Sequence, residues 1–399
     1  MSDLKIIVPS NFREFGKKVN KHIQAIRENN DNYLVSLEEV RFNNGEGKIV
    51  LNESIRDKDV YILSDVSNYD ISYQCYGRTH YMGPDEHFLD IKRILSAECG
   101  HATKRTLILP YLYESRQDKK DGRESLDCAI ALQELERMGA NEFVTCDVHS
   151  SGVANAIPNK AFENVRLGDI LLFDLLTHEG IDDYDKLICI SPDEGAMKRA
   201  RFFSDLLGNI PIGSFYKQRD YTKIVDGKNP IKDHRFLGPA DMEGRYAIIV
   251  DDMIASGGSI LDTAKSLKKL GVEKIYLMVT FALFTNGVDK FQEYYDKGYI
   301  NRVYASNVSY VPAEYASKEW FKLVDCSHRI ANIISELNYG HSIGELIKCS
   351  PEMAVKIKRL RMENGKKKNK QLEKSKEVSE QLRPIVKRTS KKTTKKVKS

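Results

Sequence analysis

Short apolar runs alternate with amphipathic segments along most of the chain. The apolar runs predict β-strands at 60–64, 107–110, 143–146, 187–191, 247–250, 275–279 and 302–305. Between them, apolar positions recurring every three or four residues predict helices over 86–99, 126–138 and 260–270. This alternation is typical of βαβ units, and it predicts an α/β fold with mostly parallel sheets.

Two segments far apart in the chain share one local design. RMGANEFV (137–144) and KLGVEKIY (269–276) each place a glycine at the end of a helix and then lead into a strand. In a chain of 399 residues, this similarity predicts two similar, doubly wound domains, one over 1–165 and one over 166–362. The polar segment 217–240 is predicted to be a long surface loop.

The charge is divided unevenly along the chain. From Lys366 to Ser399 there are 14 Lys and Arg residues against three Glu residues, a charge of +11, although the whole chain carries only +5. The rest of the chain is therefore acidic. The tail over 363–399 has little to bury, and we expect it to be disordered. It has no aromatic residue for stacking on bases, so we expect no nucleic-acid partner.

Cysteine usage and hydropathy limit the cellular locations that we expect for the protein. The seven cysteines form no CxxC pair, which argues against a disulfide framework or a zinc site and favours a reducing, cytoplasmic location. No apolar run approaches the roughly 20 residues that a membrane helix needs, and the N-terminus lacks the pattern of a signal peptide. We therefore expect no association with a membrane.

The stretch IIVDDMIASGGSI (248–260) carries the most distinctive chemistry. It places Asp251 and Asp252 at the carboxyl end of a predicted strand, where ligands bind in open parallel sheets. The small residues Ser256, Gly257, Gly258 and Ser259 then open a helix, so backbone N–H groups and hydroxyls are available to an anion. A sugar phosphate fits both features. The alternative is a tight turn with an ordinary helix cap; a Walker A loop is excluded because no Gly-Lys-Ser/Thr follows.

This stretch resembles the phosphoribosyl-pyrophosphate motif of type I phosphoribosyltransferases and of ribose-phosphate pyrophosphokinases. Five further stretches resemble the pyrophosphokinases, in that family's order: RFNNGEGKIVLNESIRDKDVYI (41–62), PYLYESRQDKKDGRES (110–125), VTCDVHS (144–150), ISPDEGAMKRA (190–200) and FYKQRD (215–220). The resemblance covers roughly residues 35–350. It implies two phosphoribosyltransferase-like domains and Mg²⁺-dependent transfer of the β,γ-diphosphoryl group of ATP to ribose 5-phosphate, giving phosphoribosyl pyrophosphate and AMP.

The resemblance also implies a role for each site residue. The catalytic residues would be Lys217, Arg219 and His149, and the ATP-binding residues would be Phe42, Glu46, Arg116 and Gln117. Ribose 5-phosphate would contact Asp193, Asp251, Asp252, Ser256, Gly257, Gly258 and Ser259, while His149 and Asp193 would lie at the Mg²⁺ ion. The family further implies a homo-oligomer, a hexamer built from dimers, in which Phe42 stacks on adenine bound by a neighbouring subunit.

Two departures from the family and one alternative function accompany this reading. Ala255 stands where the family commonly has an acidic residue, and Asn44 stands where an Asp usually follows the aromatic residue. The alternative is a non-catalytic regulatory homologue that keeps the fold and binds active subunits. Such a protein should have lost charged catalytic residues, whereas this chain retains them.

Overall fold

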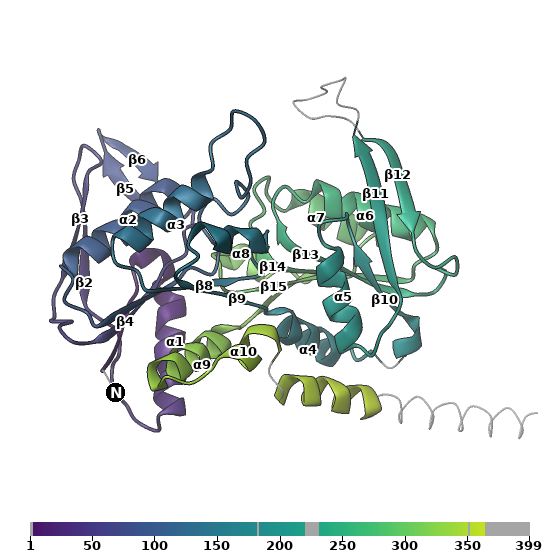
Figure 1. Ribbon diagram of the computed structural model, residues 1–399. Coiled ribbons are helices and arrows are strands. Elements are labelled where there is room, and N and C mark those ends of the chain that lie inside the picture. The colour runs from purple at the N-terminus through teal and green to yellow at the C-terminus, as the bar shows by residue number, and fades with distance from the viewer. Residues whose placement is uncertain (1–2, 182, 220–230, 350–351, 364–399) are drawn as a thin grey trace, which may run out of the picture.

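Two open β-sheets, both largely parallel, form the core of the protein (Figure 1). The computed structural model describes residues 3–181, 183–219, 231–349 and 352–363, with the backbone alone for 217–219 and 231–234. The strands of the first sheet are all parallel, in the order β1 (Leu4–Ile7), β4 (Asp59–Leu63), β7 (Lys104–Ile108), β8 (Glu142–Cys146) and β9 (Ala161–Val165). The predicted α/β class is confirmed.

Helices cover both faces of the first sheet, which explains the continuous apolar runs. In β4, Val60 and Ile62 pack toward α2 (Pro84–Ala97) and α3 (Asp127–Arg137). The alternate residues Tyr61 and Leu63 pack toward α1 (Arg13–Ile26) and α9 (Ser327–Tyr339). A strand that is buried on both faces has no polar alternation, because successive side chains point to opposite sides of the sheet.

The second sheet repeats this plan with more strands. Its order is β12 (Ile231–Leu237), β11 (Ile212–Arg219), β10 (Leu187–Ser191), β13 (Tyr246–Ile254), β14 (Lys274–Ala282), β15 (Arg302–Ser306) and β16 (Phe321–Val324). Only the edge pair β11–β12 is antiparallel. One face is covered by α4 (Gly168–His178) and α5 (Met197–Leu206), and the other by α6 (Gly258–Lys269), α7 (Asp289–Asp296) and α8 (Ala313–Ala316).

Smaller elements complete the described chain. Two antiparallel hairpins, β2 (Leu37–Arg41) with β3 (Gly47–Leu51) and β5 (Ser72–Cys75) with β6 (Arg78–Tyr81), extend the first half. Short 3₁₀-helices occur at η1 (Ser10–Phe12), η2 (Ser151–Ala156) and η3 (Tyr184–Lys186), and α10 (Gly344–Lys348) is a short α-helix. No helix in the described part of the chain is both long enough and apolar enough to cross a membrane.

The loop predicted over 217–240 is wrong for the residues that the structure describes. Lys217 to Arg219 end β11, and 231–237 form β12, so the segment is largely an edge hairpin. The buried Phe215 of β11 and the partly buried Phe236 of β12 lie opposite each other, with ring centroids 5.3 Å apart. Strands β11 and β12 were not predicted, because the sequence between these two residues is mostly polar. Residues 220–230, and the predicted tail from 364 onward, lie outside the described residues.

The chain passes from the first sheet to the helices of the second between Val165 and Gly168. It also returns. Helix α9 follows the last strand of the second sheet but packs on α1, where Ile330 and Ile334 join the core of the first half. The chain then crosses once more, because Ile357 of the helix over 352–363 joins the core of the second half, so three passages join the two halves.

Asp325 stabilises the start of this returning helix. Its Oδ1 accepts hydrogen bonds from the backbone N–H and hydroxyl of Ser327 and from Asn307, and its Oδ2 lies 3.0 Å from Nζ of Lys18 on α1. Burial alone would favour the neutral acid, but these donors lower the pKa of Asp325 to about 2.

We expect Asp325→Ala to lower the free energy of unfolding by about 1 kcal/mol at pH 7, a figure that allows for solvent screening of a half-exposed carboxylate. Because the folded-state pKa is depressed, this contribution is present above the unfolded-state pKa of about 4 and is lost as the pH falls toward 2. Urea unfolding of both proteins at pH 7 and below pH 3 measures it. Asp205→Ala, at an exposed helical site, serves as the control; a difference that persists undiminished at low pH would contradict the assignment.

Candidate active site

The order in which the chain adds strands to the second sheet reverses between β10 and β13. After β10 the chain adds β11 on one side, and after β13 it adds β14 on the other, so these two strands flank a topological switch point. Ligands of open α/β sheets bind in the crevice at the carboxyl ends of such strands. Asp193 follows β10, and Asp251 and Asp252 lie near the end of β13. The structure thus brings these three predicted residues to one place.

The two aspartates lie within β13 and not just after it, which corrects the predicted end of this strand. Strand β13 stays paired with β14 as far as Ile254, whereas its pairing with β10 ends at Ile249. The neighbouring β14 is also longer than predicted, and it supports this extension. The side chains of Asp251 and Asp252 interact with each other at this point of the strand.

Asp252 pairs with His149 of the first half. Its Oδ2 lies 2.7 Å from Nδ1 of His149, which follows β8. This hydrogen bond raises the pKa of His149. Burial of Asp252 would favour its neutral form, but the bond to His149 and the charge of Arg199 lower the pKa of Asp252. This contact joins the two halves at the carboxyl ends of both sheets.

Asp251 has the opposite electrostatic character. Burial, together with the adjacent charge of Asp252, raises the pKa of Asp251. Nη1 of Arg199 lies 3.6 Å from its Oδ1 and offsets part of this effect. The carboxyl group of Asp251 therefore has the cation Arg199 on one side and the anion Asp252 as its neighbour. A ligand with hydroxyls or positive charge would change the ionisation of Asp251.

A cavity of about 390 Å³ opens beside these residues and takes its walls from both halves. The first half contributes Asp147, His149 and Asn164, and the second contributes Arg199 and Asp251. Further lining residues are Val148, Ser150, Ser151, Arg166, Gly168, Leu171, Glu194, Gly195, Lys198, Phe202, Phe203, Met278, Val279 and Thr280. Carboxylates and cations therefore share one cleft, which is suited to a polar, charged ligand.

The glycine-rich loop after β13 has the geometry that an anion requires. Gly257 adopts φ +78°, and a Cβ atom there would lie 2.5 Å from the ring of Phe291, so only glycine fits. Helix α6 begins at Gly258, two residues earlier than predicted, and Gly258 borders open space. Ser259 is exposed in the first turn and Ser256 is partly exposed. The helix N-terminus thus presents its N–H groups toward the crevice side of the sheet.

Of the predicted ATP-binding residues, Arg116 lies nearest to this site. It is exposed on the loop after β7, and its charge opposes the raised pKa of His149. Gln117, on the same loop, donates from Nε2 to the carbonyl of Ser125 at 2.6 Å. Phe42 and Glu46 instead occupy the exposed turn between β2 and β3 and do not line the cavity of the same chain.

The two predicted loop cations are only partly placed. Lys217 and Arg219 lie on β11, in register with His234 and Ile231 of β12. Their side chains fall outside what the structure describes, so their roles stay predictions.

Sequence reasoning missed Lys198 and Arg199 as site residues. Both lie in the first turn of α5 and line the cavity. A cation at a helix N-terminus opposes the helix dipole, so this placement was a detectable signal that these charges serve a ligand. Asp147 was also missed; its Oδ2 accepts from Oγ1 of Thr280 at 2.6 Å and so joins the two halves.

The donor atoms at the site fit a magnesium ion that has few protein ligands and takes its other ligands from water and substrate. The described residues contain no cluster of three or more His, Cys, Asp or Glu side chains able to enclose a metal. Mg²⁺ usually retains several waters and binds one or two carboxylates together with substrate phosphates. The exposed carboxylate of Asp193 suits that mode, while Nδ1 of His149 is already engaged by Asp252.

The two largely parallel sheets, the carboxylate pair and the glycine loop define an α/β enzyme with its site at the carboxyl ends of the strands. Residues 4–139 match the family model of the N-terminal domain of ribose phosphate pyrophosphokinase, and residues 216–348 match that of the phosphoribosyl synthetase-associated domain. Together the two models cover more than half of the chain, so the chain belongs to the ribose-phosphate pyrophosphokinase family, a family of diphosphotransferase enzymes that synthesise phosphoribosyl pyrophosphate.

Individual relatives agree with this assignment. Ribose-phosphate pyrophosphokinase of Mycoplasma genitalium is 28% identical over 305 residues, which span 76% of this chain and 83% of the relative. The enzyme of the same name from Synechococcus elongatus is 30% identical over 248 residues, 61% of this chain and 66% of the relative. The crystal structure of phosphoribosylpyrophosphate synthetase from Mycobacterium smegmatis superposes with a TM-score of 0.69 at 20% identity, covering 85% of this chain and 99% of that chain, and supports the fold.

Proposed function

We propose that this protein transfers the β,γ-diphosphoryl group of ATP to O1 of ribose 5-phosphate in the presence of Mg²⁺. The O1 oxygen forms a bond to the β-phosphorus, the bridge from the β- to the α-phosphorus breaks, and AMP leaves while the O1 proton is released. The observation that carries this proposal is the convergence of His149 from one half and Asp251 and Asp252 from the other beside a glycine-rich helix N-terminus.

The second half would hold ribose 5-phosphate. The 5-phosphate would accept hydrogen bonds from the loop Ser256, Gly257, Gly258 and Ser259, where the helix N-terminus favours negative charge. The ribose hydroxyls would donate to the carboxylates of Asp193, Asp251 and Asp252. The raised pKa of Asp251 supports its assignment to a hydroxyl-binding position, since either ionisation state can share a hydrogen bond with a hydroxyl.

The first half would hold ATP. Arg116 and Gln117 would contact the nucleotide, and His149, with its pKa raised by Asp252, would supply positive charge next to the phosphates. Phe42 and Glu46 do not line the cavity of their own chain, so they would serve the adenine of a second copy, Phe42 by stacking and Glu46 by accepting from the amino group. This requires a homo-oligomer, and a hexamer built from dimers is the state we propose.

Mg²⁺ would be held by Asp193, with His149 beside it, and water and substrate phosphates would complete its coordination. When bound, it would neutralise phosphate charge and orient the diphosphoryl group. The protein's own part is to align O1 with the β-phosphorus and to place Lys217 and Arg219 where charge develops on the transferring group.

Product analysis tests the proposal directly. The full chain is incubated with ATP and Mg²⁺, with and without ribose 5-phosphate. AMP that forms only with ribose 5-phosphate is the expected result, whereas ADP would mean an ordinary kinase. Bound ribose 5-phosphate without any turnover would favour the alternative, a non-catalytic regulatory homologue.

In the same assay, we expect His149→Ala to lower kcat about 10²-fold, because one charged donor next to the phosphates is lost. Ribose 5-phosphate binding, measured by calorimetry, should change little. Glu345→Ala, at an exposed site on α10, is the control. A kcat for His149→Ala within twofold of the unaltered protein would remove His149 from the reaction.

A further inference from the structure

The turn between β5 and β6 holds an aromatic residue in a conformation that costs stability. Cys75 pairs with Arg78, so Tyr76 and Gly77 alone form the turn, with φ of +47° and +72°. Asn-Gly is the favoured pair for such a turn, since a tyrosine Cβ disfavours the left-handed region. The ring gains little from packing, because Tyr76 is 79% exposed. A strained backbone that supports an exposed aromatic ring points to a ligand.

This turn lies against the turn that carries Phe42. The backbone N–H of Tyr76 donates to the carbonyl of Asn43 at 2.9 Å. Gly45 lies so close that a Cβ atom there would be 3.4 Å from the sulfur of Cys75. Phe42 itself is 48% exposed. Two exposed aromatic residues thus lie on adjoining turns, and the carboxylate of Glu46 shares the same surface.

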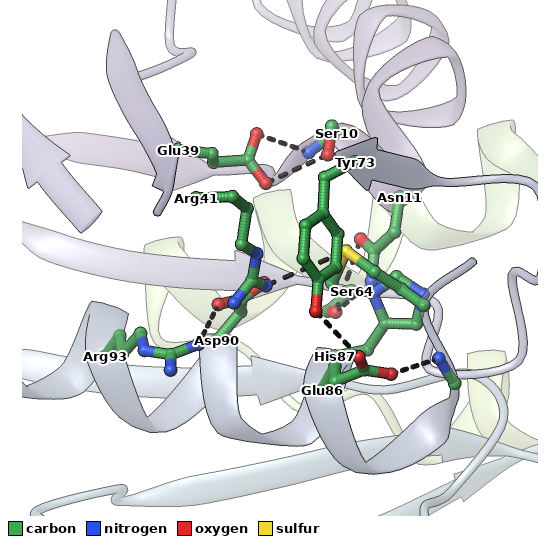
Figure 2. A network of polar contacts seen from close by, with 12 residues as sticks. Ser10, Asn11, Glu39, Arg41, Ser64, Tyr73, Glu86, His87, Asp90 and Arg93 are labelled. Atoms are coloured by element: carbon green, nitrogen blue, oxygen red, sulfur yellow. Dashed lines mark hydrogen bonds and ion pairs between the residues drawn. The ribbon is translucent and has the colours of Figure 1, made fainter. Parts of the chain in front are cut away.

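A polar network fixes the two hairpins relative to each other and to α2 (Figure 2). Arg41, which precedes Phe42, forms an ion pair with the buried Asp90 of α2, and its guanidinium lies 5.5 Å from the ring centroid of Tyr73. The hydroxyl of Tyr73 donates to Oε1 of Glu86 at 3.3 Å, and His80 contacts the same oxygen at 2.6 Å. The surface formed by the two turns is therefore preorganised, which lowers the entropy lost when a ligand binds.

The position and chemistry of the surface formed by the two turns indicate which ligand it could bind. Figure 1 draws both hairpins at the end of the first half that faces away from the second half, and neither Phe42 nor Tyr76 lines the cavity of its own chain. A ligand that contacts these two residues would therefore lie outside the described cavity of the same chain. Flat aromatic faces with a nearby carboxylate match a purine base that carries an amino group.

We propose that Tyr76 is a second base-contacting residue of the nucleotide site, which meets the adenine of ATP bound by a second copy together with Phe42. This inference rests on the function proposed above and adds to it a residue on a hairpin to which none of the sequence motifs assigns a role. The ring would stack on or flank the base, and the network through Arg41 and Tyr73 would hold it in position.

Replacement of Tyr76 by Asn tests the inference without harming the turn, because Asn tolerates the left-handed region. We expect the KM for ATP to rise about 10-fold, the usual scale for losing one base–aromatic contact, and the KM for ribose 5-phosphate to stay unchanged. Tyr76→Phe should retain most of the affinity. The matched control is Tyr81→Thr, which removes another exposed tyrosine, from strand β6 of the same hairpin, and should leave both KM values unaltered.

Two further measurements separate the possible outcomes. Calorimetric affinity for α,β-methylene-ATP is measured for the same variants, so the inference is tested even if the chain makes no AMP and the proposed function fails. Sedimentation reports the oligomeric state. Unchanged ATP parameters in Tyr76→Asn would overturn the inference. Dissociation of the oligomer with equal losses for both substrates would also overturn it, in favour of a purely structural subunit contact.

Discussion

Replacement of both Lys217 and Arg219 by Ala is expected to lower kcat for AMP formation by about 10³–10⁵-fold. Attack at the β-phosphorus spreads negative charge over the transferring group and onto the leaving AMP, and fixed cations stabilise that charge more in the transition state than in the ground state. The two residues lie two positions apart at the end of β11, at the edge of the second sheet. KM values for both substrates should change far less than kcat.

The fold of this double variant should be intact, since β11 is held by backbone pairing to β10 and β12. The exchange variant Lys217→Arg with Arg219→Lys keeps the charge but alters its geometry. It should recover only part of the rate if Arg219 contacts phosphate through two nitrogens. Full activity of the Ala variant, with an unaltered unfolding curve, would show that the cations of the transition state come from elsewhere, with Lys198 and Arg199 as the next candidates.

Replacement of Arg329 by Met is expected to lower the free energy of unfolding by about 3–5 kcal/mol. Nη2 of Arg329 lies 2.6 Å from Oδ2 of Asp169, and the two side chains are 4% and 0% exposed. Nη1 donates to the backbone carbonyls of Arg166 and Leu346 at 3.2 and 2.8 Å. Loss of the guanidinium leaves a carboxylate and two carbonyl groups buried without these donors.

A second variant distinguishes the charge from simple loss of packing. Arg329→Met combined with Asp169→Leu removes both charges, and an apolar pair often replaces a buried ion pair at little cost. We expect the double variant to recover most of the stability in urea unfolding. Equal destabilisation of the single and double variants would mean that packing and the two carbonyl contacts, and not the ion pair, hold this junction.

The sequence predicted best those strands whose burial is complete. Strand β10 was predicted with the bounds that the structure has, because it is buried on both faces and reads as one apolar run. Strand β12 was missed because an edge strand needs few buried side chains, and Phe236 alone gives no period. The returning position of α9 could not be predicted either, since its apolar stripe does not specify which sheet it covers.

The site was predicted as a set of residues, and its geometry was not. The glycine loop and the carboxylate pair follow from local rules of strand, turn and helix. The bond between His149 and Asp252 joins residues 103 positions apart, and no local pattern reports such a contact. Tyr76 was missed for a related reason: an exposed tyrosine is ordinary in a sequence, and only its backbone conformation and its neighbour Asn43 make it notable.

The repeated passage of the chain between the halves limits how this enzyme can admit its substrates. A hinge that opens a cleft usually bends at one or a few connecting segments that give way together. Here the link after β9 and the return at α9 would both have to yield, along with the buried pair of Arg329 and Asp169. We therefore expect the two halves to move as one body during turnover. Substrate entry and product release would then depend on movements of loops at the edge of the cavity, which leave the buried core unchanged.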